Sequence, residues 1–101
     1  MTKKEAVVLA RTAVQETKKL TAEGRHASAY RVAAKAADSI NRGCENRTLR
    51  QLFCRPGGGW SAMGDGAKVW LLNDEEYQAA QDLKAAVAAI PTDNYYGYTD
   101  K

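Results

Sequence analysis

The chain has 101 residues, 45% of them hydrophobic, and a net charge of +3, which suits a single domain. Much of the apolar content is alanine, so we expect closely packed helices that leave little volume for a buried substrate. No segment approaches the roughly 18 consecutive apolar residues of a membrane-spanning helix. The basic start is not followed by the apolar core of a secretion signal, and we therefore expect a cytoplasmic protein.

The first half of the chain is predicted to form two antiparallel helices. Apolar residues recur at i, i+3 and i+4 over residues 3–22, and Thr2 with Glu5 gives the capping-box pattern at the start of this helix. The same spacing continues through several alanines and Ile40, which predicts a second helix over residues 26–42. A short connection between two such helices favours a helical hairpin.

The middle of the chain is less regular. A short helical turn is predicted at about 48–53, and the Pro-Gly-Gly-Gly run that follows Arg55 ends it. Two short runs with aromatic and β-branched residues flank a Gly-Asp-Gly turn at 64–66. This pattern predicts a two-stranded antiparallel β-hairpin over about 60–72.

A last helix is predicted over about 74–90. Asn73 and Glu76 repeat the capping-box spacing, and acidic residues fill the first turn, where they favour the helix dipole. The tail, 92–101, is expected to be loose unless it docks on the rest of the chain. The expected fold is therefore one mostly helical α+β domain, residues 1–101.

The charge of the chain is divided by position. Residues 1–55 carry twelve lysines and arginines against five acids, whereas residues 56–101 carry three against seven. On a helical projection, basic residues lie opposite the apolar faces of the two predicted helices. A solvated helix face is the plainer interpretation, but few acids interrupt these stripes, which favours contact with an anionic partner. The candidate contacts are Lys4, Arg11, Lys18, Arg31, Lys35 and Arg42, extended by Arg47, Arg50 and Arg55.

The predicted hairpin gives a second candidate surface. Trp60, Met63 and Trp70 lie in it, and apolar residues occur on both of its faces. A small core is the plainer interpretation of these side chains. The alternative is a protein interface, formed by pairing of an edge strand or by a homodimer.

The glycine run after Arg55 gives a weaker third candidate. Exposed main-chain amides beside Arg55 and Trp60 suit a stacked base or a peptide. The run does not match the Gly-x-x-x-x-Gly-Lys-Ser/Thr pattern of a phosphate-binding P-loop. A connector between elements is its plainer interpretation.

The residues needed for catalysis are few. His26 stands alone in the turn between the first two helices, and Cys44 and Cys54 have no other histidine to serve as a base. Two cysteines without a Cys-x-x-Cys motif do not make a zinc site, and the spacing leaves their pairing open. We expect no enzyme, metal or cofactor.

The leading hypothesis is a non-enzymatic protein whose basic helical face binds nucleic acid, a nucleoprotein or an acidic protein surface. The alternative is a protein–protein inhibitor or adaptor that acts through the Trp60–Leu72 hairpin. In its short length, single domain and lack of catalytic residues the chain resembles a compact accessory protein of a phage or mobile element, although it carries no family motif. For the alternative, that resemblance implies an inhibitor of a host defence complex, such as an anti-CRISPR protein.

Overall fold

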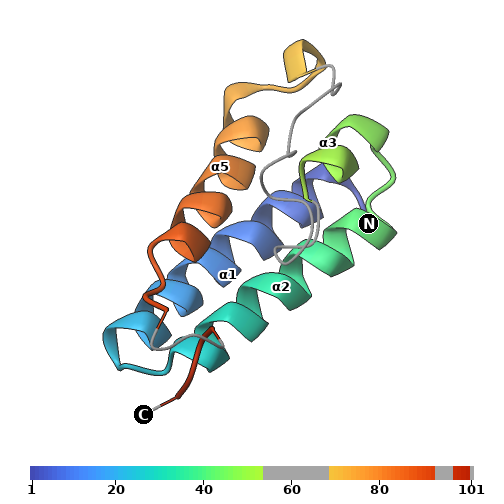
Figure 1. The fold of residues 1–101 in the computed structure, drawn as a ribbon. Helices are drawn as coiled ribbons and strands as arrows, with labels where there is room; N and C mark the ends of the chain where they lie inside the picture. The colour runs from blue at the N-terminus through green and yellow to red at the C-terminus, as the bar shows by residue number, and fades with distance from the viewer. Residues whose placement is uncertain (54–68, 93–96, 101) are drawn as a thin grey trace.

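The computed structural model describes residues 1–53, 69–92 and 97–100, and the described part of the chain is helical (Figure 1). Its elements are α1 (Lys3–Ala22), α2 (His26–Gly43), α3 (Arg47–Leu52), the 3₁₀-helix η2 (Val69–Leu71) and α5 (Asp74–Ala88). α1 packs against both α2 and α5 and is therefore the central helix. None of the described helices is both long and apolar enough to cross a membrane.

Local signals place the ends of α1 where the sequence predicted them. Thr2 Oγ1 accepts a hydrogen bond from the Glu5 main chain at 3.2 Å, and the Glu5 carboxylate accepts one from the Thr2 main chain at 3.0 Å. The Thr2 main-chain N–H first, and then the Thr2 hydroxyl, stabilise the Glu5 carboxylate and hold its pKa below the ordinary value. Gly24 follows the helix with a φ of 78°, a left-handed conformation that glycine adopts without strain.

Small residues let the three long helices approach closely. Ala6, Ala10, Ala33, Ala37 and Ala80 are completely buried where these helices meet. The bulkier part of the core is supplied mainly from α2, α3 and α5. Its largest fully buried apolar side chains are Phe53, Ile40, Leu49, Leu52 and Leu83.

The start of α5 also has the predicted capping box. Asn73 Oδ1 accepts a hydrogen bond from the Glu76 main chain at 2.8 Å, and Glu76 Oε1 accepts one from the Asn73 main chain at 3.0 Å. Glu76 is buried, because this capping carboxylate lies against α1. The cap therefore fixes the beginning of α5 beside the beginning of α1.

The predicted two-stranded β-hairpin over 60–72 is wrong. The described ranges contain no β-strand, and Val69–Leu71 forms a 3₁₀ turn where the second strand was expected. Residues 60–68 lie outside the described ranges. The preference of aromatic and β-branched residues for strands depends on cross-strand neighbours. Here Leu72 packs against the helical core, and the capped start of α5 follows directly.

The end of the chain docks on α2. The Tyr98 ring stacks on Tyr30 with 4.7 Å between centroids and 22° between planes. Asp100 forms a single antiparallel β-bridge with Arg25. Residues 97–100 are thus held against the start of α2, the docked outcome that the sequence left open.

Candidate functional site

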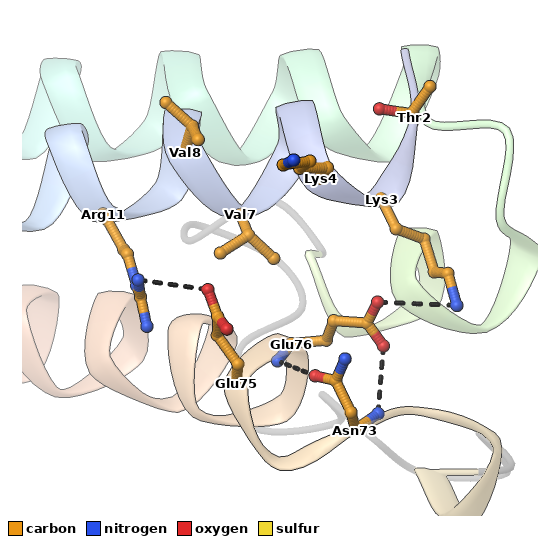
Figure 2. A pocket seen from close by; sticks show the side chains of 9 residues that line it. All are labelled: Thr2, Lys3, Lys4, Val7, Val8, Arg11, Asn73, Glu75 and Glu76. Atoms are coloured by element: carbon orange, nitrogen blue, oxygen red, sulfur yellow. Dashed lines mark hydrogen bonds and ion pairs between the residues drawn. The ribbon is translucent and has the colours of Figure 1, made fainter.

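A surface hollow lies between the first turns of α1 and α5 (Figure 2). Its volume is about 520 Å³. It is lined by Thr2, Lys3, Lys4, Val7, Val8 and Arg11 of the α1 segment and by Asn73, Glu75 and Glu76 of the α5 segment. Because α1 and α5 both begin here, the hollow gathers three cations of one helix and two acids of the other.

The two acids of the hollow form ion pairs with two of its cations. Lys3 Nζ lies 3.4 Å from Glu76 Oε2, and Arg11 Nη1 lies 3.1 Å from Glu75 Oε1. Lys4 forms no ion pair with any residue in the described ranges, and its side chain is exposed. Lys4 is therefore the cation of this hollow that is available to an external anion.

The predicted α1 stripe is a line of exposed cations. Lys4, Arg11 and Lys18 are each exposed, and their spacing of seven residues places them about 10 Å apart along the helix axis. Lys18, like Lys4, makes no ion pair with the described residues. Only Arg11, in the middle of the line, is partly neutralised by a carboxylate.

The predicted α2 stripe is more strongly neutralised. Arg31 Nη2 lies 3.5 Å from Asp100 Oδ2, and Arg42 Nε lies 3.2 Å from Asp38 Oδ1. Lys35 is exposed and has no ion pair within the described ranges. These acids are Asp38, one turn before Arg42 in α2, and Asp100, near the opposite end of the chain.

The two stripes do not form one continuous basic surface. Lys4 and Arg11 border the hollow between α1 and α5, whereas Lys35 borders a separate hollow between α1 and α2. A third hollow on α1 separates them, and its lining includes Val8, with 60% of its surface exposed, and the acid Glu5. We therefore treat the α1 stripe as the principal site.

The remaining predicted contacts are scattered. Arg47 is exposed on α3, and Arg50 is half-buried, with its carbonyl accepting a hydrogen bond from Asn41 at 2.9 Å. Arg55, Trp60 and Met63 lie outside the described ranges. Trp70 is 76% exposed and Leu71 59% exposed, so these two side chains of η2 are not core residues.

Sequence reasoning missed that the carboxylate of Asp100 binds at the start of α2. Asp100 Oδ1 accepts a hydrogen bond from the Ser28 main chain at 2.9 Å, and Asp100 Oδ2 accepts one from the Ser28 hydroxyl at 2.6 Å. The Ser28 hydroxyl, the Ser28 main chain and then the charges of Arg31 and Arg25 hold the pKa of Asp100 below its ordinary value. The two residues are 72 positions apart, which no local pattern reveals.

The described residues offer no candidate metal site. They hold no group of three or more His, Cys, Asp or Glu side chains placed to bind a metal ion. Cys44 is buried with a free thiol, and His26 is buried at the start of α2.

Comparisons with protein families, with curated proteins and with solved structures gave no match. The function is therefore argued from the surface of this chain alone.

Proposed function

We propose that this chain is a small non-enzymatic binding protein that engages an anionic partner through the α1 stripe. The partner class is nucleic acid, a nucleoprotein or an acidic protein surface. The observation that supports this proposal is the line of Lys4, Arg11 and Lys18, in which both end members are exposed and unpaired within the described ranges. Lysines without intramolecular partners are free to exchange solvent counterions for a partner's anionic groups.

Such a contact has predictable properties. Point charges on flexible stems bind phosphates or carboxylates without reading a base sequence. Binding should therefore weaken as salt is raised and should depend little on the order of bases or residues in the partner. Lys18 lies toward the end of α1, where a further hollow is lined by the cations Lys19 and Arg25 and by the acids Glu16 and Glu23, so the net positive charge does not extend from the stripe to the start of α2.

The test compares two charge reversals. Lys18→Glu removes an end of the α1 stripe, and Lys84→Glu makes the same charge change on α5, away from the stripe. The probes are a labelled 20-nucleotide thymidine strand and polyglutamate, with binding followed by fluorescence anisotropy at low salt. For the probe that binds, we expect Lys18→Glu to weaken affinity by about tenfold and to lower the salt slope by about 1. Equal effects of the two reversals, or no binding of either probe, would refute the proposal.

A second candidate function is a protein–protein inhibitor or adaptor that uses η2 rather than a β-hairpin. The observation that favours it is the exposure of Trp70 and Leu71 side by side in sequence. Tryptophan is enriched among the residues that dominate binding energy in protein interfaces. Copurification from the native host separates the two functions. Loss of a protein partner with Trp70→Ala but not with Lys18→Glu supports this second function.

A further inference from the structure

The α1 stripe is part of a longer exposed seam on the same helix. Five exposed residues follow one another at alternating steps of four and three positions, which places them on one face of α1. They are Lys4, Val8, Arg11, Gln15 and Lys18. None of them is an acid, and the three cations recur at every seventh position, roughly 10 Å apart along the helix axis. The α1 seam therefore carries positive charge at intervals of two turns.

Val8 is an apolar member of this seam that lies largely outside the packed interior. In Figure 2 the buried Val7 is directed from α1 toward α5, whereas Val8 is directed away from α5 and has 60% of its surface exposed. A β-branched residue at an exposed helical position lowers helix propensity without a gain in packing. Val8 and Lys4 together line two adjoining hollows, of about 520 and 410 Å³. An apolar surface thus lies directly beside a lysine.

The acids around these two hollows are engaged within the chain. Glu75 pairs with Arg11 at 3.1 Å, whereas Glu5 and Glu76 accept main-chain hydrogen bonds in the two capping boxes. Lys4 has no ion pair within the described ranges. The two linings together carry three cations and three acids, a balance that gives a polyphosphate no general advantage. The hollows instead favour a partner that combines an apolar side chain with a carboxylate for Lys4.

We propose that the partner of the α1 stripe is an acidic amphipathic helix of another protein, which packs along the α1 seam. This inference rests on the proposed function and narrows its partner to one class. A helix that repeats a carboxylate at every seventh position has the same interval as Lys4, Arg11 and Lys18. Straight helices drift by only about 20° in seven residues, so the match holds over the length of the seam.

The apolar contact separates this partner from nucleic acid. An apolar side chain on the same face of the partner helix would lie against Val8, where it removes exposed apolar surface from water. A nucleic acid strand also meets the three cations, but its phosphates gain nothing from an apolar surface. Binding that depends on Val8 therefore indicates a protein helix.

The experiment uses two labelled synthetic peptides of about 21 residues, or three heptads. Both have the same composition of alanine, glutamate and leucine, and circular dichroism verifies that both are helical. One, the heptad peptide, repeats its glutamates and its leucines at every seventh position, and the other has the same residues in scrambled order. The thymidine strand is the third probe. By fluorescence anisotropy at low salt, we expect the heptad peptide to bind about tenfold more tightly than the scrambled one.

Two variants of equal charge test the apolar contact. Val8→Gln removes the apolar surface and keeps a good helix former at the position. Leu71→Gln is the matched control, because Leu71 is 59% exposed but lies on η2. We expect Val8→Gln to weaken binding of the heptad peptide about fivefold, and Leu71→Gln by less than about twofold. Binding of the scrambled peptide and of the thymidine strand should not change in Val8→Gln.

Several results would overturn the helical partner. One is equal affinity for the two peptides, and another is an equal loss from Val8→Gln and Leu71→Gln. A third is a dimer in analytical ultracentrifugation that Val8→Gln dissociates, which would assign the α1 seam to a second copy of the chain.

The same probes distinguish failure of this inference from failure of the proposed function. If the thymidine strand binds, Lys18→Glu weakens its binding and neither peptide binds, the inference fails and the proposed function stands. If no probe binds, or if Lys18→Glu and Lys84→Glu weaken binding equally, the proposed function fails and the inference fails with it.

Discussion

Arg11 of α1 and Glu75 of α5 form an ion pair across the hollow between these helices, with 3.1 Å between Nη1 and Oε1. Both side chains are more than half exposed. A pair in this setting adds little to stability, because water solvates both partners and salt screens them. The acid lowers the positive charge in the middle of the α1 stripe, and under the proposed function this reduces the attraction for an anionic partner.

Removing that acid should strengthen binding without changing the fold. Glu75→Gln frees the Arg11 guanidinium, and we expect tighter binding of the thymidine strand with a steeper salt dependence. The free energy of unfolding should change by less than about 1 kcal/mol in urea. Glu16→Gln, at an exposed acid on the opposite face of α1 from the stripe, controls for net charge. Weaker binding by Glu75→Gln than by the control would mean that the pair positions Arg11 rather than masks it.

Thr17 offers a test of the core. Its side chain is completely buried in α1, and its hydroxyl oxygen has no hydrogen-bond partner among the described residues. A buried hydroxyl without a partner costs stability, so Thr17→Val, which keeps the shape, should raise the free energy of unfolding by about 1 kcal/mol. Urea denaturation measures the change, and Thr12→Val on the exposed face is the comparison. A loss of stability in Thr17→Val would show that the hydroxyl is satisfied.

Trp70 offers a test of exposure. Burial of this ring in a core would make Trp70→Ala cost about 3–5 kcal/mol. Because three quarters of the residue is exposed, we expect the change in unfolding free energy to stay within about 0.5 kcal/mol. Thermal and urea unfolding both report it. A loss of several kcal/mol would assign the ring to the core and would remove the basis for the second candidate function.

The carboxylate of Asp100 should make the docking of the tail depend on pH. Its pKa is lowered in the folded chain, chiefly by the Ser28 hydroxyl, so the charged form is the one that binds. Docking is therefore fully stabilised above the ordinary pKa of 3.8 and is lost as pH falls through the lower, folded value. The positive charges that face this carboxylate are those of Arg31 and Arg25.

The Ser28 amide proton gives a direct reading of this titration by NMR, because it donates to Asp100 Oδ1. We expect its resonance to move as the pH falls below about 4, and to stay fixed in Asp100→Asn. If the resonance moves equally in the wild-type chain and in Asp100→Asn, then a group other than Asp100 causes the shift.

The local features of the fold were predictable from the sequence. The capping boxes of Thr2 with Glu5 and Asn73 with Glu76 depend on residues three positions apart, and both are formed. The apolar spacing placed α1 and α2 within a residue of their observed ends. The β-hairpin over 60–72 was wrong because strand preference is weak until a neighbouring strand supplies cross-strand contacts, whereas a cap acts within a single turn.

What the sequence by itself determined was therefore the position of the helices and the exposed line of Lys4, Arg11 and Lys18, since both follow from the helical period. What only the tertiary structure decided was which cations remain available. From the sequence, only acids on the same helix could be matched with a basic residue. In the structure Glu75 of α5 pairs with Arg11 of α1, and Asp100 pairs with Arg31 of α2. Their attraction acts through space over a few ångströms, regardless of separation along the chain. Packing thus left Lys4 and Lys18 unpaired within the described ranges and paired Arg31 with the end of the chain.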